Sequence, residues 1–329
     1  MTRRNAIAPP TRGAGFWVCL ATLLLAACGN ENPSDTGRDK PLLAVGISVA
    51  SLRNPYFAAI AHGAEAGARA YNPTVQVSTA ADNYSALTQS AEIDAFVAGH
   101  ADVILLTPAD PAQIGDAIAR ARAAGIAVIA IDAPAAGADA EVATDNAAAG
   151  ALACGALAQA LGGHGQVAIL GGPAAPAATA RWYGCADALA RLPDIRVVAV
   201  AADGQGTREG GRQAMRDIYA AATQVDAVFA VNDVEALGAA DTAGDLGRAT
   251  LVAAAEGSPA IEAALANRAR ANIVAAAALD PYAMGRSAVA VGIDIRNGRE
   301  PKPEQRLLDP ALLTRDSVHD YKGWLAERE

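Results

Sequence analysis

Five side chains that can form hydrogen bonds lie shortly after apolar runs that we predict to be strands. They are Asn54, Thr107, Asp132, Asn232 and Glu256. An asparagine amide both donates and accepts, and a carboxylate accepts from two hydroxyls in strong, charge-assisted bonds. The rings of Tyr56 and Phe57 follow Asn54 and could cover an apolar C–H face. Together these groups predict a site for a polyhydroxylated small molecule, although each residue could instead cap a helix, fill a turn or pack in the core.

The residue types that most enzymes and metalloproteins require are scattered or missing. Four histidines occur without the spacing of a metal site, namely His62, His100, His164 and His319. There is no Gly-x-Ser-x-Gly or Walker sequence, and Gly204-Gln205-Gly206 has Glu209 where a dinucleotide loop needs its third glycine. We therefore expect no catalytic residue, no metal and no cofactor.

Short apolar runs alternate with longer segments of helical pattern along the chain. The predicted strands are 42–47, 75–77, 103–106, 126–131, 167–170, 197–201, 227–230 and 251–254. The predicted helices are 56–71, 87–97, 111–124, 145–161, 179–190, 208–221, 234–243 and 281–297, followed by short strands near Leu307 and Leu313. This alternation predicts an α/β fold with parallel sheets, and its two successive rounds predict two similar doubly wound lobes. Ligands of such sheets bind at the carboxyl ends of the strands, where the five side chains fall.

Several short segments resemble, in the same order, those of the ribose-type periplasmic sugar-binding proteins. The first is 51–57, Ser-Leu-Arg-Asn-Pro-Tyr-Phe, and the last runs from Asp280-Pro281-Tyr282 to Gly285. Between them lie the similar segments 106–110, 129–132, 144–146 and 228–233. Arg181, which is followed by Gly184, is similar to the family's sugar-binding arginine. The resemblance covers nearly all of the chain after Leu42.

The resemblance implies a type I periplasmic binding protein, in which two lobes joined by a hinge close over a ligand. The implied ligand-binding residues are Asn54, Tyr56, Phe57, Thr107, Asp132, Thr144, Arg181, Asn232 and Glu256. We expect segments 132–144 and 279–280 to act as hinge strands. The implied ligand is a monosaccharide or related polyol, and the implied partners are the permease and ATPase of an ABC importer.

Some positions depart from the family's pattern. Ala133 stands in place of an arginine, Leu279 in place of a glutamine, and Ala255-Glu256 in place of a Phe-Asp pair. A stacking aromatic residue is missing near Gly204, and Trp182 could supply a replacement ring or simply pack on its lobe. These changes predict a roomier and more apolar cleft on the side of the second lobe, and they argue against ribose itself.

The start of the chain has the organisation of a bacterial export signal. Three arginines precede an apolar run from Phe16 to Ala27, which is too short to span a bilayer as a stable helix. Leu25-Ala26-Ala27-Cys28 resembles a lipobox, which implies cleavage before Cys28 and acylation of its sulfur, for example with palmitate. The alternative is an ordinary signal peptide with a chance cysteine. We expect a periplasmic protein that is anchored to a membrane through lipid only.

These patterns divide the chain into four predicted parts. They are a signal peptide at 1–27, a lipidated flexible tether at 28–41, an N-terminal lobe formed by 42–143 and 281–308, and a C-terminal lobe formed by 144–280 and 309–329. The tether is assigned because its residues are mostly small and polar.

Cys154 and Cys185 would remain after export into an oxidising compartment. Each falls in a predicted helix that flanks the first strand of the second lobe. A disulfide forms if those helices are neighbours, and two buried free thiols are the alternative.

Composition excludes several classes of protein. The 329 residues are 52% hydrophobic and 19% charged, which supports a large core and disfavours disorder. The formal net charge of −9 argues against a nucleic-acid partner. No apolar run after Cys28 is long enough for a transmembrane helix. We expect a monomer.

Alternatives to sugar import remain open at this point. The same cleft would serve a sensory protein that reports its ligand to a receptor kinase, or a binding protein for a small molecule other than a sugar. A LacI-type regulator shares the fold but would need an N-terminal helix-turn-helix where this chain has a signal.

Overall fold

The computed structural model describes residues 40–201, 203–270, 272–299 and 304–324. The predicted signal peptide, Cys28 and nearly all of the predicted tether lie outside these residues. Among the described helices, none is both long and apolar enough to cross a membrane.

The described chain forms two six-stranded sheets. The first has the order β11-β5-β4-β3-β1-β2 and is parallel throughout. Its strands are β1 (Ala44–Val49), β2 (Gln76–Ala81), β3 (Val103–Leu106), β4 (Ala127–Ile131), β5 (Ala140–Thr144) and β11 (Gln305–Leu308). The second has the order β12-β10-β9-β8-β6-β7, in which only β12 runs antiparallel. Its strands are β6 (Gly165–Leu170), β7 (Ile195–Ala201), β8 (Ala227–Ala230), β9 (Leu251–Glu256), β10 (Ile273–Ala278) and β12 (Ala311–Thr314). Two similar parallel-sheet α/β lobes are therefore confirmed.

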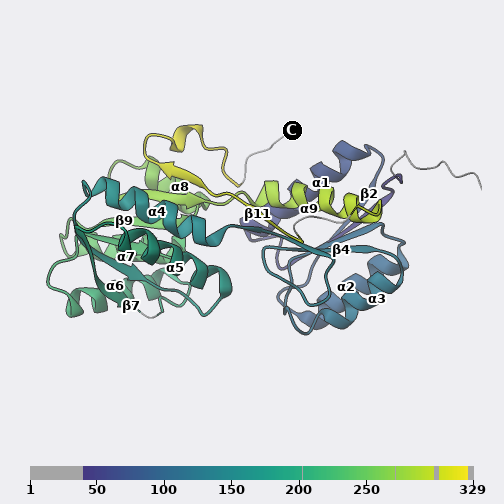
Figure 1. Ribbon diagram of the computed structural model, residues 1–329, viewed down its shortest axis with the longest axis horizontal. Helices are drawn as coiled ribbons and strands as arrows, with labels where there is room; N and C mark the ends of the chain where they lie inside the picture. The colour runs from purple at the N-terminus through teal and green to yellow at the C-terminus, as the bar shows by residue number, and fades with distance from the viewer. Residues whose placement is uncertain (1–39, 202, 271, 300–303, 325–329) are drawn as a thin grey trace, which may run out of the picture. The chain divides into compact units, whose positions relative to one another are not determined.

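Helices cover both faces of the first sheet (Figure 1). Helices α1 (Pro55–Tyr71) and α9 (Pro281–Arg296) lie on one face, and α2 (Ala86–Ala98) and α3 (Gly115–Ala123) lie on the other. Ile60 of α1 and Met284 of α9 belong to one buried cluster, whereas Phe96 of α2 belongs to the second. Helix α9 and strand β11 thus complete the lobe that begins at β1.

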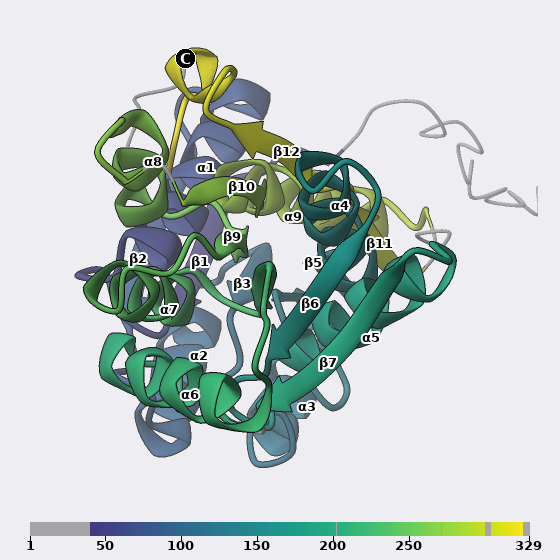
Figure 2. The same cartoon turned by 90° about the vertical axis from the view of Figure 1, so that its left-hand side faces the viewer.

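The second sheet is covered in the same way (Figure 2). Helices α4 (Asn146–Ala160) and α5 (Pro176–Ala190) pack on one face. Helices α6 (Arg208–Ala221), α7 (Asp233–Asp245) and α8 (Pro259–Ala266) pack on the other, together with the short 3-10 helix η1 (Val318–Asp320).

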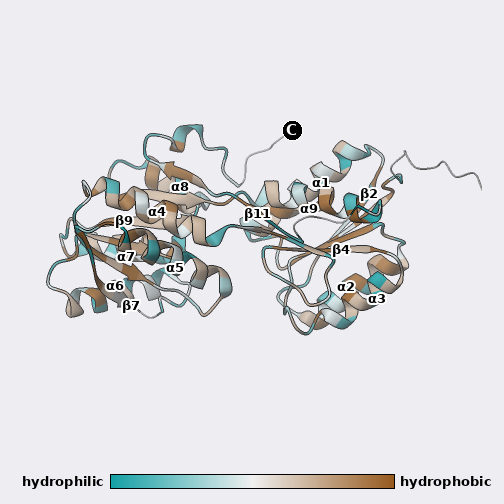
Figure 3. Ribbon diagram, viewed as in Figure 1, coloured by the Kyte–Doolittle hydropathy of each residue, from teal (hydrophilic) through white to brown (hydrophobic). Residues whose placement is uncertain are grey.

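The central strands are buried at every residue because helices cover both of their faces. This holds for β3, β4 and β8, whose sequences are continuous apolar runs. Figure 3 shows β4 as a hydrophobic segment inside its lobe. The sequence signal for such strands was therefore strong.

Polar side chains start most of the helices by accepting a hydrogen bond from a backbone N–H of the first turn. Asp145 caps α4 in this way by accepting from Ala148 N at 2.8 Å. Asn54, Asn232 and Asp280 cap α1, α7 and α9. Each of these residues follows a strand or a crossing segment, so capping fixes where a chain leaves the edge of its sheet.

Two predicted segments differ from the structure. The helix expected from Pro111 begins only at Gly115, because Asp110 Oδ1 accepts from Ala112 N and Gln113 N and closes a turn there. The segment 132–144, expected as a hinge strand, ends in β5, which pairs with β4 and β11 inside the first sheet. The chain therefore leaves this sheet at Thr144 and enters α4 directly.

Candidate ligand-binding site

Asp132 and Tyr56 meet at the carboxyl edge of the first sheet. Asp132 follows β4 with a left-handed backbone (φ 73°), and its N–H donates to Val142 O at 2.9 Å. Tyr56 lies in the first turn of α1, and its hydroxyl donates to Asp132 Oδ1 at 2.6 Å. The tyrosine thus holds the carboxyl group in place and leaves its second oxygen available to accept from a ligand.

Burial shapes the ionisation of this pair. It raises the pKa of Asp132, while the hydrogen bond from Tyr56 and the positive charge of Arg181 act in the opposite direction. Burial also raises the pKa of Tyr56 well above its ordinary value, and the charge of Asp132 adds to this effect. Tyr56 therefore stays a hydrogen-bond donor at neutral pH.

Aromatic rings surround Tyr56. The centroids of Tyr56 and Phe57 lie 5.5 Å apart, and those of Tyr56 and Trp324 lie 5.2 Å apart, both edge to face. Trp324 is buried, and its Nε1 donates to Leu279 O at 3.2 Å. The chain near its C-terminus thus contributes a ring to the site of the first lobe, which the sequence analysis missed because Trp324 follows no predicted strand.

The other candidates of the first lobe have structural partners. Asn54 Oδ1 accepts from Tyr56 N at 3.0 Å as the helix cap. Thr107 is buried, and its hydroxyl oxygen accepts from Ala50 N at 3.2 Å, which fastens the loop after β1. Thr144 is buried, and its hydroxyl donates to Met284 Sδ at 3.7 Å. Neither Thr107 nor Thr144 forms a hydrogen bond with Tyr56 or Asp132 in the part of the chain that the structure describes.

Arg181 is the buried cation of the second lobe, with a side chain 7% exposed. Its Nε donates to Asn146 Oδ1 at 2.8 Å, and its Nη1 donates to Val231 O at 3.0 Å and Glu256 Oε1 at 3.1 Å. Within the described residues, no acceptor bonds Nη2. One end of the planar guanidinium group therefore remains to donate to a ligand oxygen.

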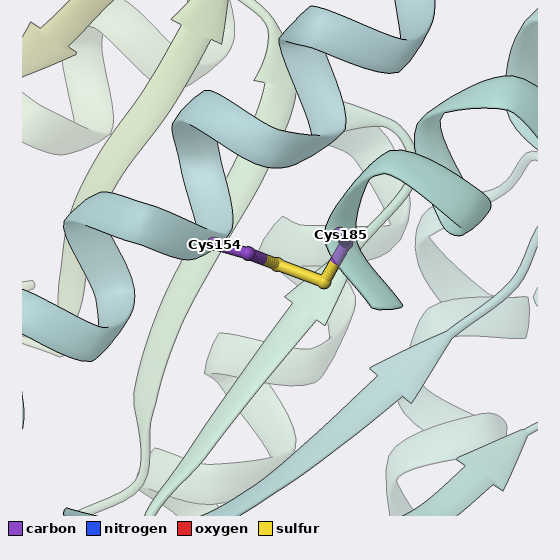
Figure 4. The surroundings of a disulfide bond; sticks show 2 residues. All are labelled: Cys154 and Cys185. Atoms are coloured by element: carbon purple, nitrogen blue, oxygen red, sulfur yellow. A yellow bond between two sulfur atoms is a disulfide. The ribbon is translucent and has the colours of Figure 1, made fainter. Parts of the chain in front are cut away.

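Close packing of α4 against α5 positions Arg181. A Cβ at Gly150 would collide with Arg181 O, and one at Gly184 would collide with Ala147 O. A disulfide between Cys154 and Cys185, whose Cα atoms are 5.2 Å apart, also joins these helices (Figure 4). The reading of these cysteines as two free thiols therefore does not hold in this structure.

Glu256 and Asp233 form an acidic group beside Arg181. Glu256 Oε2 accepts from Asp233 N at 3.4 Å, and the Glu256 side chain is 30% exposed. Asp233 is fully buried, and its Oδ2 accepts from Ser258 N at 2.6 Å. Burial, followed by the charge of Glu256, raises the pKa of Asp233 to about 7. Arg181 therefore balances only part of the negative charge in its surroundings.

Glu235 is a buried carboxyl group that the sequence analysis did not consider. Its Oε1 accepts from Gly206 N at 2.6 Å, and burial raises its pKa to about 7. A Cβ at Gly204 would lie 2.7 Å from Cδ of Glu235, and the cap Asn232 accepts from Glu235 N at 3.0 Å. Glu235 thus fills the space beside Gly204, where the resemblance had implied an aromatic ring.

Trp182 lies outside this polar group. It is half-buried, and its ring meets Tyr183 edge to face at 5.0 Å. Both residues line a cavity of about 350 Å³ together with the loop 171–174. Gly172 of this loop lies against Asn232 and Glu235, so the cavity adjoins the carboxyl edge of the second sheet.

Two groups of side chains therefore emerge. The first lobe brings together Asn54, Tyr56, Phe57 and Asp132, and the second brings together Arg181 and Glu256 with Asn146 and Asp233. Within the described residues, no group of three or more potential ligands could hold a metal ion. The arrangement offers donors, acceptors and ring faces, which is the chemistry of binding a polar molecule with apolar faces.

Known proteins are similar to this chain in sequence and fold. Residues 45–300 match the family described as a periplasmic binding protein domain. The ribose import binding protein RbsB of Bacillus subtilis (strain 168) is 30% identical over 289 residues, which are 85% of this chain and 92% of that protein. The xylitol-binding protein of Mycolicibacterium smegmatis is 29% identical over 68% of this chain and 63% of its own length.

A solved structure gives the same result. The periplasmic solute-binding protein of an ABC transporter from Actinobacillus succinogenes 130z, with bound D-allose, superposes with a TM-score of 0.73. It is 26% identical to this chain, and the match covers 85% of this chain and 100% of that one. The family match over most of the chain and the near full-length likeness to a ribose-binding relative lead to one conclusion: the chain belongs to the periplasmic binding protein family, as a type I member of the kind found in the ribose-binding proteins of ABC importers.

Proposed function

We propose that this protein is a lipid-anchored periplasmic substrate-binding protein that captures a monosaccharide or related polyol and delivers it to an ABC importer. Its two lobes would close over the ligand about the segments that connect the sheets, and the closed form would be presented to the permease. Binding, and not catalysis, is the expected activity.

The observation that carries the proposal is the environment of Arg181. A buried guanidinium group holds Glu256 with Nη1 and keeps Nη2 without a protein acceptor among the described residues. Asp132, on the first lobe, keeps one carboxyl oxygen beyond its bond to Tyr56. A ligand hydroxyl both donates and accepts, so it can satisfy a carboxylate and a guanidinium at the same time.

The relatives support the same class of ligand. Those described above are named for ribose and xylitol, and the solved structure holds D-allose. All three molecules carry several hydroxyls on a short carbon chain or ring. We infer a ligand of this class, without choosing one of them.

Export and anchoring rest on the sequence from Met1 to Cys28. The basic start, the apolar run and the lipobox-like Leu25–Cys28 favour acylation at Cys28. Stable anchoring requires more than one acyl chain. An anchored binding protein would keep its ligand close to a permease in the membrane.

The test is a thermal-shift screen of the purified protein against sugars, polyols, nucleosides and amino acids, followed by calorimetry for every hit. A ligand at about 100 times its Kd would stabilise the folded protein by about 2.7 kcal/mol. We expect at least one sugar or polyol among the hits, and uptake of that compound should fall when the gene is deleted. A response to nucleosides or amino acids alone would refute the sugar class, and unchanged uptake would refute delivery to an importer.

A further inference from the structure

Tyr84 presents an exposed aromatic ring at the carboxyl end of β2. Its side chain is 63% exposed, although tyrosine is a large and mostly apolar residue. Asn83 and Tyr84 both have left-handed backbones, with φ of 53° and 62°. Such a conformation is unfavourable for a residue with a bulky side chain and persists only where the surrounding structure enforces it.

A buried polar network enforces this backbone. Tyr84 N donates to Asp82 Oδ1 at 2.7 Å, and Asp82 Oδ2 accepts from Gln89 Nε2 at 2.9 Å. Asp82 and Gln89 are both fully buried. Asn83 N donates to Ala50 O at 3.0 Å, which ties the turn to the loop before α1. The fold therefore holds a strained turn rigidly and gains little burial from the ring that the turn carries.

The ring of Tyr84 ends a row of four aromatic residues. Its centroid lies 6.2 Å from that of Phe57, edge to face. Phe57 in turn meets Tyr56, and Tyr56 meets Trp324. Aromatic residues make up only 4% of the chain, so four rings in successive contact are a strong local concentration. Tyr84 is the exposed end of the row that contains the candidate ligand residues Tyr56 and Phe57.

We propose that Tyr84 is a further ligand-contacting residue, which determines specificity for a sugar or polyol that extends past Phe57. The ring would cover a C–H face of the extending part, and the phenol would exchange hydrogen bonds with its hydroxyls. This inference rests on the proposed function, because it places Tyr84 at the same site. It explains why a strained turn displays a ring that the core does not use.

The test compares Tyr84→Asn, Tyr84→Phe and Tyr71→Asn by calorimetry, using the best ligand from the screen. Asparagine tolerates a left-handed backbone better than tyrosine, so Tyr84→Asn should not lower the melting temperature of the ligand-free protein. We expect its Kd to rise about tenfold, whereas Tyr84→Phe should stay within about threefold of wild type. Tyr71 lies at the far end of α1, so Tyr71→Asn should leave Kd unchanged.

The outcomes separate this inference from the proposed function. A Kd for Tyr84→Asn within twofold of wild type would overturn the role of Tyr84 while leaving sugar binding intact. A lower melting temperature with unchanged Kd would assign Tyr84 a structural role instead. If the wild-type protein binds only another class of ligand, the proposed function fails, and the same comparison with that ligand still decides whether Tyr84 contacts it.

Discussion

The charged side chains of Asp132 and Arg181, at the carboxyl edges of the two sheets, are held in place by different sets of hydrogen bonds. Asp132 depends on one tyrosine hydroxyl, whereas Arg181 is fixed by three acceptors from α4, the end of β8 and the end of β9. Each still has one hydrogen-bonding group to offer. A ligand hydroxyl that lost either partner would be buried without a bond, and such a loss costs about 1–3 kcal/mol.

Removing either charge should therefore weaken ligand binding. We expect Asp132→Ala and Arg181→Ala each to raise Kd at least about tenfold, since 1.4 kcal/mol is one decade. Arg181→Lys should also bind poorly, because an ammonium group cannot reproduce the planar set of donors. Calorimetry with the screened ligand measures all three. Arg191→Ala, an exposed change at the end of the same helix, is the matched control, and wild-type affinity in both alanine variants would contradict the site.

The two buried carboxyl groups Asp233 and Glu235 predict a pH-dependent stability. Burial raises the pKa of each to about 7, so the folded protein binds more protons than the unfolded chain between about pH 4 and pH 7. Their contribution is complete below about pH 4 and is lost as the pH rises through 7. Glu235→Gln keeps the acceptor for Gly206 N but cannot ionise, so its melting temperature should fall less than that of wild type between pH 5 and pH 8.

Circular dichroism melts at the two pH values test this prediction. Glu65→Gln, in an exposed pair with Arg69, provides a change of the same kind on the surface and should leave the wild-type pH dependence intact. An identical drop in wild type and Glu235→Gln would mean that Glu235 is ionised in the folded protein at both pH values.

At the scale of elements, the junction of α4 and α5 positions Arg181. The Cys154–Cys185 bond closes a separation of 31 residues, which stabilises the folded state by about 3–4 kcal/mol in the chain-entropy account. We expect the reduced protein to lose about this much free energy of unfolding in urea. Ligand affinity should fall as well, because Arg181 lies one turn before Cys185 on α5.

The comparison is made between oxidised and reduced protein carrying Cys28→Ala, which removes any thiol at the predicted acylation site. Equal urea midpoints before and after reduction would indicate that the bond does not form in the exported protein. Mass spectrometry of unreduced periplasmic material provides an independent measurement, since two free thiols there would contradict the bond directly.

Some elements could be predicted well from the sequence, because a strand that is buried on both faces has an apolar residue at nearly every position. Strands 103–106 and 227–230 match β3 and β8 to the residue, since each is a continuous apolar run covered on both faces. β10 was not predicted, because its four alanines favour helix as much as strand. Only pairing with β9 and β12 makes this segment extended. α8 was not predicted, because eight residues are too few to show the spacing of apolar residues that is typical of a helix.

The residues of the candidate site could likewise be predicted only where a local sequence pattern indicates their position. Strand ends predicted Asn54, Asp132 and Glu256, because the carboxyl ends of parallel strands meet at one edge. Trp324 could not be predicted, since nothing local relates it to Tyr56. Glu235 had a weak signal in Gly204, whose missing side chain leaves room for it, but its burial depends on how the loops around Gly172 and Gly206 pack beside α7.

At the scale of the whole molecule, the order of the chain links the two sheets repeatedly. The chain leaves the first sheet after β5 and returns to the first lobe through Asp280 into α9. It then passes from β11 of the first sheet to β12 of the second across Asp309-Pro310. Closure about such segments would need few residues to change their backbone angles. The short connections therefore suit the proposed capture of a ligand between lobes.

The proposed membrane anchor would belong to the exported protein as a whole and would depend on Cys28. Acylation there would hold the binding protein at the membrane, and none of the helices that the structure describes is both long and apolar enough to cross one. We expect wild-type protein to incorporate labelled palmitate and to sediment with membranes, whereas Cys28→Ala should remain unlabelled and appear in the soluble fraction. Cys19→Ala, within the apolar run of the predicted signal, is the matched control and should label like wild type. Because the lobes begin after residue 40, both variants should bind the ligand with the same affinity. A Cys28→Ala protein that still labels and sediments would exclude Cys28 as the anchor, and this result would not bear on the binding site.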